Sequence, residues 1–222
     1  MSLYVIGGQK GGTGKSTLAT NLAVAFTRSG RHVLLVDTDR QLTASHWSDA
    51  RERDPTLPPI TTVQKTGTLY RVLVDTTELY DEVIVDAGGF DSVELRTALA
   101  AADHLYSPVK ASQSDLWTLE AMSELVLQAR DLNPSLGAHL VLSLAPTNPS
   151  VSSARDARRL LEQYPAFGIC EAVIHNRKAF EDATAGGRGV LEGPDVKAQN
   201  EILAFSREVM SHGISASLSQ AS

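Results

Sequence analysis

The sequence contains a single cysteine, Cys170, among its 222 residues. One thiol cannot form an intramolecular disulfide, and it cannot supply a cluster of thiolate ligands. No apolar run approaches the ~20 residues of a membrane-spanning helix. The start, Met1-Ser2-Leu3, runs directly into an apolar segment and leaves no room for the regions of a signal peptide. These absences predict a cytoplasmic protein without a membrane anchor.

The chain also lacks an excess of positive charge, since its formal net charge is −6. This balance argues against a general nucleic-acid binder, although a local basic face is compatible with it. The composition, 42% hydrophobic and 21% charged, suits one sizeable core. Because no repeat, low-complexity block or long linker is found, we expect one domain over residues 1–212 and a short, frayed polar tail over 213–222.

The most informative segment present is a phosphate-binding loop, Gly-Gln-Lys-Gly-Gly-Thr-Gly-Lys-Ser-Thr, at residues 8–17. Its glycines let backbone N–H groups turn inward around phosphate oxygens. Lys15 places a cation near the β and γ phosphates, and Ser16 offers a hydroxyl to Mg²⁺. Gln9 stands where the usual pattern has its first glycine. The expected nucleotide-binding residues here are Gly11, Gly12, Thr13, Gly14, Lys15, Ser16 and Thr17.

A second lysine, Lys10, precedes Lys15 by five positions in the same loop. One lysine suffices for the phosphates bound by the chain's own loop. Lys10 therefore indicates a cation offered to another subunit.

Short apolar runs alternate with helical patterns along the chain. This alternation predicts an α/β fold, a doubly wound and mostly parallel sheet of about seven strands with the P-loop NTPase architecture. The predicted strands are Tyr4–Gly7, His32–Asp37, Ile60–Val63, Glu82–Asp86, His104–Val109, His139–Ala145 and Cys170–His175. The predicted helices are Lys15–Ser29, Gly67–Glu78, Val93–Ala101, Ser114–Leu132, Val151–Gln163 and Pro194–Met210.

Carboxylates follow two of the apolar strands at the sheet edge where ligands of such folds bind. Asp86 is the better candidate for holding Mg²⁺, and the following Gly88 and Gly89 allow a loop that senses the γ phosphate. Asp39 is the better candidate for orienting an attacking water and is a second candidate near the metal. For Asp37, a structural role in capping a turn is about equally expected.

Three segments together resemble the ParA/MinD family of deviant Walker ATPases: the loop above, Val-Asp-Thr-Asp-Arg-Gln, and Val-Ile-Val-Asp-Ala-Gly-Gly. The resemblance covers nearly the whole chain and is greatest to short ParA-type partition ATPases that lack an N-terminal DNA-binding extension. It implies ATP and Mg²⁺ as cofactors and a homodimer that closes on ATP. Lys10, Lys15 and Asp39 would be catalytic, Lys10 by reaching the partner subunit's phosphates. Ser16, Asp39 and Asp86 would lie at the metal.

The sequence departs from the family at both switch loops. Arg40 stands where switch I usually has proline, and Ala87-Gly88-Gly89 stands where switch II often has prolines. These changes concern loop rigidity and hydrolysis rate rather than nucleotide binding. After the sixth predicted strand no guanine-reading segment is found, which favours adenine, with Asn148 and Asn176 as candidate contacts.

The resemblance implies an ATPase that drives plasmid or chromosome segregation, binds DNA non-specifically when ATP-bound, and releases it when a centromere- or cargo-binding adaptor stimulates hydrolysis. It would then associate with the nucleoid. Two alternatives are a ParA-like ATPase that positions a protein assembly and, with less support, a metabolic enzyme like dethiobiotin synthetase. A basic membrane helix like that of MinD is not found. The candidate DNA contacts, which a solvated charged surface would explain equally well, are Arg155, Arg158, Arg159, Arg177, Lys178 and Arg188.

Overall fold

The computed structural model describes residues 1–222 except 77, 89–90, 111–112, 149–152 and 221–222. For 113–117, 153–156 and 214–220 the backbone alone is described. Within these residues the strands form one parallel sheet in the order β3-β2-β4-β1-β5-β6-β7. The strands are β1 (Ser2–Ile6), β2 (Val33–Asp37), β3 (Thr61–Gln64), β4 (Glu82–Asp86), β5 (His104–Val109), β6 (Gly137–Ala145) and β7 (Gly168–His175). The predicted α/β P-loop fold is confirmed.

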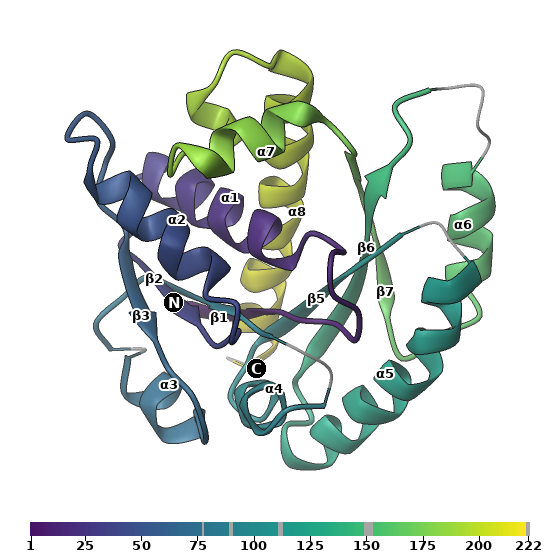
Figure 1. The fold of residues 1–222 in the computed structure, drawn as a ribbon. Coiled ribbons are helices and arrows are strands. Elements are labelled where there is room, and N and C mark those ends of the chain that lie inside the picture. The colour runs from purple at the N-terminus through teal and green to yellow at the C-terminus, as the bar shows by residue number, and fades with distance from the viewer. Residues whose placement is uncertain (77, 89–90, 111–112, 149–152, 221–222) are drawn as a thin grey trace.

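Helices cover both faces of the sheet (Figure 1). On one face lie α1, α2, α7 and α8, and on the other lie α3, α4, α5 and α6. Their bounds are α1 (Lys15–Arg28), α2 (Thr43–Glu52), α3 (Tyr70–Thr76), α4 (Val93–Leu99), α5 (Gln113–Leu132), α6 (Ser153–Leu161), α7 (Lys178–Ala185) and α8 (Val196–Gln220), with a 3₁₀ turn, η1, at Val190–Glu192.

Side-chain alternation along the central strands produces two separate cores. In β1, Leu3 and Val5 pack under the α3–α6 layer, whereas Tyr4 and Ile6 pack under α1 and α8. Because both faces are covered, β2 and β4 are buried at every position. This burial explains why their sequences read as continuous apolar runs rather than as alternating ones.

The register of β2 and β4 places the two predicted loops side by side. These strands pair in parallel, with Asp37 opposite Asp86. On the other side of β4, Ile6 at the end of β1 also lies opposite Asp86. The phosphate-binding loop and both carboxylate-bearing loops therefore leave the sheet at the same level.

The sequence analysis did not predict helices α2 and α7, and α2 is joined by a buried ion pair to η1, which follows α7. Arg51 of α2 is 3% exposed and forms two hydrogen bonds to Glu192, of 2.9 and 2.7 Å. Its guanidinium also donates to the carbonyl of Gly187, just after α7. A Cβ at Gly187 would lie 2.1 Å from the backbone nitrogen of Arg51, so the close approach requires glycine. The segment after switch I and the segment after α7 are thus packed as one unit.

The C-terminal helix is longer than predicted. The sequence analysis ended it near Met210 and expected a frayed tail from residue 213, whereas the backbone of α8 is helical to Gln220. No proline interrupts this stretch, and Gly213 fits because a Cβ there would lie 3.1 Å from the Ser2 and Tyr4 side chains. Within the described part of the chain, no helix has the length and apolar character needed to cross a membrane.

Candidate nucleotide-binding site

The phosphate-binding loop connects β1 to α1 and ends in two glycines with left-handed backbone conformation. Gly12 has φ 69° and Gly14 has φ 94°. Side chains rarely adopt these angles, so the loop shape depends on glycine at both positions. A Cβ at Gly14 would also lie 3.0 Å from the Ser143 hydroxyl of β6. The loop opens directly onto the N-terminus of α1, where backbone N–H groups and the helix dipole favour an anion.

Lys15 and Lys10 occupy this loop in different ways. The Lys15 side chain is 7% exposed, and its Nζ donates to the backbone oxygen of Lys10 at 2.8 Å. Burial lowers the pKa of Lys15, and the nearby Asp86 and Asp39 carboxylates oppose that shift. The structure therefore brings together Lys15, Asp39 and Asp86, as the sequence predicted. The Lys10 side chain is half-buried in the same loop.

Asp86 at the end of β4 is a fully buried carboxylate. Neither of its oxygens forms a well-defined hydrogen bond within the described residues. Burial raises its pKa to about 7, although the neighbouring Ser16 hydroxyl and Lys15 ammonium act in the opposite direction. An unpaired buried carboxylate is costly unless a cation satisfies it. Asp86 and Ser16 thus fit a site for Mg²⁺, held directly or through water.

Asp86→Asn is expected to raise the melting temperature of the nucleotide-free protein at pH 8 by about 2–4 °C. Because the pKa of Asp86 is raised by folding, its contribution to stability is lost as pH rises through about 7. The neutral amide removes that penalty. The same substitution is expected to abolish the additional thermal stabilisation that Mg²⁺ provides over ATP with EDTA. Asp75→Asn, at an exposed position of α3, is the matched control. An unchanged melting temperature with Mg²⁺ stabilisation retained would contradict the prediction.

Asp37 at the end of β2 and Asp39 just after it differ in their hydrogen bonds. Asp37 is 1% exposed and its carboxylate accepts hydrogen bonds from the Asp39 amide and from both the amide and hydroxyl of Ser45. These bonds hold the start of α2, so the structural interpretation of Asp37 is supported. Asp39 is partly exposed, and its Oδ1 accepts only the local Gln41 amide among the described hydrogen bonds. Asp39 is therefore the carboxylate available to a ligand or water.

A cavity of about 490 Å³ lies beside the phosphate-binding loop. Its walls come from the loop and α1, from the ends of β6 and β7, and from α7. Asn176, a predicted base contact, lines it, whereas Asn148, the other, is not among its lining residues. The position suits the nucleoside part of a nucleotide whose phosphates lie on the loop.

The sequence analysis did not predict the part of this cavity wall that α7 forms, because it did not predict the helix itself. Phe180, Glu181 and Thr184 of α7 line the cavity. The available signal was a helix-favouring segment ending in Gly186 and Gly187, a common stop. Leu144 also lines the cavity and has φ 52°, where β6 and β7 shift register. A left-handed leucine next to a ligand cavity is backbone strain of the kind found at functional sites.

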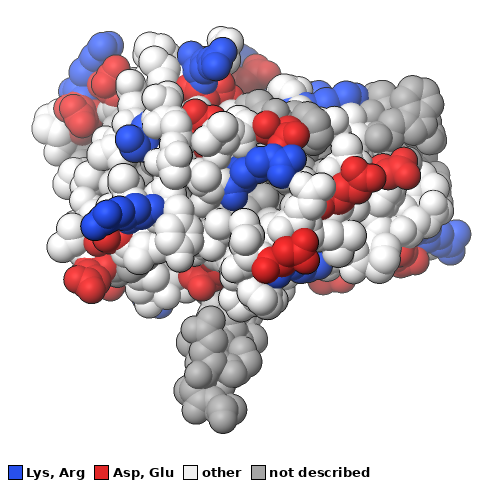
Figure 2. All heavy atoms as spheres, turned by 90° about the horizontal axis from the view of Figure 1, so that it is seen from below, with Lys and Arg blue, Asp and Glu red and all other residues white. Residues whose placement is uncertain are grey.

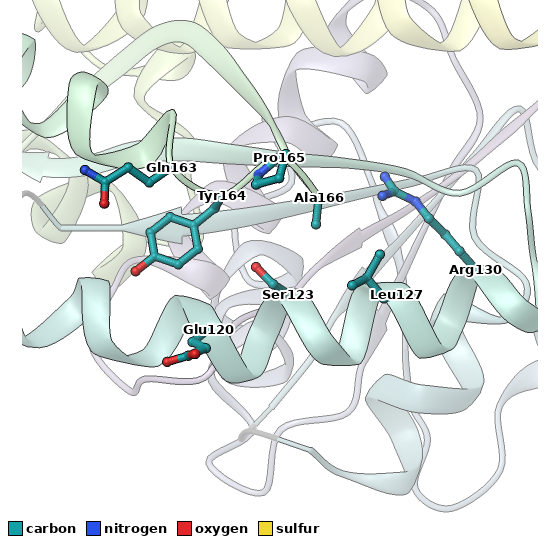
Figure 3. Close-up of a pocket in the computed structure, with 8 residues that line it drawn as sticks. All are labelled: Glu120, Ser123, Leu127, Arg130, Gln163, Tyr164, Pro165 and Ala166. Atoms are coloured by element: carbon teal, nitrogen blue, oxygen red, sulfur yellow. The ribbon is translucent and has the colours of Figure 1, made fainter.

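A second cavity, of about 520 Å³, lies between α5 and the segment after α6 (Figure 3). Glu120, Ser123 and Leu127 of α5 form one side, and Tyr164 and Pro165 form the other. None of the predicted nucleotide-binding residues lines it. Gly12, Gly14, Thr17 and Asn176, which were predicted to bind the nucleotide, line the cavity beside the loop instead.

Several of the cations predicted to contact DNA are engaged within the chain. Arg158 of α6 turns back onto β7, where it donates to the carbonyl of Cys170 and pairs with Glu171. Arg177 pairs with Glu201, and Arg188 pairs with Asp54, both at 2.7 Å.

The other predicted DNA contacts differ in exposure. Lys178 is 83% exposed and lies 3.8 Å from Asp182, and Arg159 is exposed. The side chain of Arg155 lies outside the described residues. The view from below in Figure 2 shows Lys and Arg interspersed with Asp and Glu, without a continuous basic patch, at the end away from α7. DNA contact by these residues stays a prediction.

The fold and the site define a P-loop nucleotide-binding protein. The chain belongs to the family of the CobQ/CobB/MinD/ParA nucleotide binding domain, which matches residues 4–202. This family confirms the predicted ParA/MinD resemblance, and the predicted cofactors, ATP and Mg²⁺, agree with it.

Two curated relatives and one solved structure are similar over most of this chain. The chain is 34% identical over 196 residues to "Maintenance of carboxysome distribution protein A" of Gloeobacter kilaueensis, covering 82% of this chain and 81% of that protein. It is 29% identical over 186 residues to the protein of the same name from Halothiobacillus neapolitanus, covering 82% and 83%. The structure of an McdA–ATP complex from Cyanothece has a TM-score of 0.73 at 17% identity, covering 94% of this chain and 96% of that one, and shows the common fold.

Proposed function

We propose that this protein is a ParA-type ATPase that positions a protein assembly. It dimerises on binding ATP and Mg²⁺, binds DNA without sequence preference, and leaves DNA when an adaptor protein stimulates hydrolysis. The observation that carries this proposal is the similarity, over 82% of the chain, to proteins named for maintaining carboxysome distribution. Segregation of a plasmid or chromosome, the first function expected from the sequence, has less support because neither of these relatives is named for it.

The geometry of the site supports a nucleotide-gated cycle. Lys15 and the loop amides would bind the phosphates, and Ser16 with Asp86, which lie close to Lys15, would hold Mg²⁺. When bound, Mg²⁺ would offset negative charge on the β and γ oxygens. Asp39, the carboxylate not used by α2, orients the attacking water. Lys10 reaches the phosphates bound by the partner subunit and stabilises the charge that builds during transfer.

The proposal is tested with light scattering and DNA binding on the full chain. Asp39→Ala is expected to bind ATP but hydrolyse it slowly, so it should be a monomer with ADP and a dimer with ATP. With ATP it should bind unrelated DNA at about 50 mM salt and lose most of that affinity by about 200 mM. Asp131→Ala, at an exposed position of α5, is the control that should cycle like the wild type. A protein that stays monomeric with ATP and does not bind DNA would contradict the proposal.

A further inference from the structure

The hydroxyl of Thr38 is buried between the segment that carries Asp39 and the segment that carries Asp86. Thr38 directly follows β2 and is 6% exposed. Its backbone N–H donates to the carbonyl of Asp86 at 3.0 Å. Its hydroxyl donates to the same carbonyl at 3.1 Å and accepts the backbone N–H of Gly88 at 3.4 Å. Thr38 therefore forms three hydrogen bonds to the segment around Asp86 and Gly88, two to the carbonyl of Asp86 and one from the amide of Gly88.

The two loops also touch directly at this place. A Cβ at Gly88 would lie 2.7 Å from the Cα of Asp39 and 3.0 Å from its carboxyl carbon. Only glycine allows the loop after β4 to pack so closely against Asp39. The position of the Asp39 carboxylate is therefore defined relative to the backbone of Gly88, and Thr38 holds that arrangement.

The chemistry of the contact explains why a hydroxyl is required. The same oxygen must donate to a carbonyl and accept from an amide, and a serine or threonine hydroxyl can do both. A valine has nearly the same shape but neither capacity, so it would leave the Gly88 amide without its partner. Buried hydrogen-bonding groups left unpaired destabilise the local arrangement.

We infer that Thr38 is a positioning residue for ATP hydrolysis, because its hydroxyl ties the Asp39 loop to the Gly88 loop so that the two move as one. Thr38 touches neither nucleotide nor metal in this role and acts through Asp39 and Gly88. The inference rests on the proposed ATPase activity. In this role the Thr38 side chain couples the Asp39 loop to the Gly88 loop.

The test compares Thr38→Val with Thr38→Ser on the full protein. Thr38→Val is expected to lower kcat about tenfold while changing ATP affinity by less than about threefold, since the phosphate-binding loop is untouched. Thr38→Ser retains the hydroxyl and should keep at least about half of the wild-type kcat. Thr62→Val is the matched control, because this threonine of β3 makes its described hydroxyl contact only to the nearby Ile60 carbonyl. It should behave as the wild type.

A measurement without nucleotide separates this inference from the proposed function. In the nucleotide-free protein, the amide of Gly88 is expected to exchange its hydrogen about tenfold faster in Thr38→Val than in the wild type or Thr38→Ser. Wild-type exchange at Gly88 together with wild-type kcat in Thr38→Val would overturn the inference. If the wild-type protein does not hydrolyse ATP, the proposed function fails, and the exchange at Gly88 still decides whether Thr38 joins the loops.

Discussion

Lys10→Ala is expected to lower the ATP turnover of the wild type by about 10²–10³-fold while leaving ATP affinity within about threefold. The backbone carbonyl of Lys10 contributes to the shape of the loop, since it accepts hydrogen bonds from the Lys15 ammonium and the Thr13 hydroxyl. Alanine preserves those contacts. What it removes is a cation proposed to stabilise charge on the phosphates of the partner subunit. Turnover is measured by phosphate release and affinity with a fluorescent ATP analogue.

Lys15→Ala is the comparison for this prediction. Lys15 is buried beside Asp86 and Asp39, so its loss removes the charge that holds the phosphates and should abolish detectable ATP binding. Equal losses of ATP affinity in Lys10→Ala and Lys15→Ala would contradict the role across the interface.

Mixing two inactive variants tests directly whether Lys10 acts in the partner's site. A heterodimer of Lys10→Ala and Asp39→Ala contains one site with its own Asp39 and a Lys10 supplied by the partner. Equimolar mixing is therefore expected to restore up to about a quarter of wild-type activity, because about half of the dimers are mixed and each has one complete site. If Lys10 acts within its own subunit, no site in the mixture is complete and activity stays at the level of the separate variants.

The second large effect is the loss, as pH falls below about 6.5, of the contribution to folding stability made by three packed histidines at the end of the sheet opposite the phosphate-binding loop. The His139 ring stacks on His212 of α8 with centroids 4.2 Å apart and lies 5.4 Å from His104. Tyr106 hydrogen-bonds His212 at 2.9 Å. Within the described residues, Nε2 of His104 is buried without a partner. This packing accommodates neutral imidazoles.

The sign of the effect follows from the pKa shifts. Burial lowers the pKa of all three histidines, and that of His139 falls to about 3, with neighbouring His212, His104 and Arg130 adding to the shift. Asp103 beside His104 and Glu208 beside His212 oppose it. A lowered pKa means that the unfolded chain takes up protons first. The stabilisation is therefore complete above about pH 6.5 and is lost progressively towards pH 3, on the order of 5 kcal/mol for His139 alone.

Urea unfolding between pH 7.5 and 5 checks this prediction. The free energy of unfolding of His139→Gln should fall less steeply with decreasing pH than that of the wild type, by up to about 1.4 kcal/mol per pH unit. Asp86 contributes with the opposite sign in both proteins, so the difference between them isolates the histidine. His46→Gln, at an exposed position of α2, should follow the wild type. Parallel pH profiles for the wild type and His139→Gln would contradict the assignment.

Much of the fold could be predicted because its signals are local. The strands Glu82–Asp86 and His104–Val109 were predicted to the residue, since a strand buried on both faces is a short apolar run with polar ends. Helices α2 and α7 were not predicted, because they are short and their stability comes from contacts such as Arg51 with Glu192, which are 141 residues apart. The tail of α8 was misjudged because its polar residues resemble a loop while its backbone continues a helix that packs on the sheet.

In the candidate site, too, the features that depend on residues distant in the sequence were not predicted. The sequence could not show ion pairs between distant residues, such as Arg177 with Glu201 and Arg188 with Asp54. The predicted basic surface therefore included arginines that are paired with carboxylates in the fold. Asp37 and Asp39 both follow the same strand, and sequence alone could not separate their roles. The position of Ser45 on α2 decided that Asp37 is structural.

By itself, the sequence determined the phosphate-binding loop and the family to which it points, because its glycines, Lys15 and Ser16 are contiguous within ten residues. It also placed Lys10 in this loop and Asp86 at the end of an apolar strand, the positions from which their roles were predicted. Only the tertiary structure decided which groups are buried without partners, which cations are neutralised and which loops touch. Burial and pairing depend on segments brought together from distant parts of the chain, and these distances are set when the sheet and its two helical layers pack.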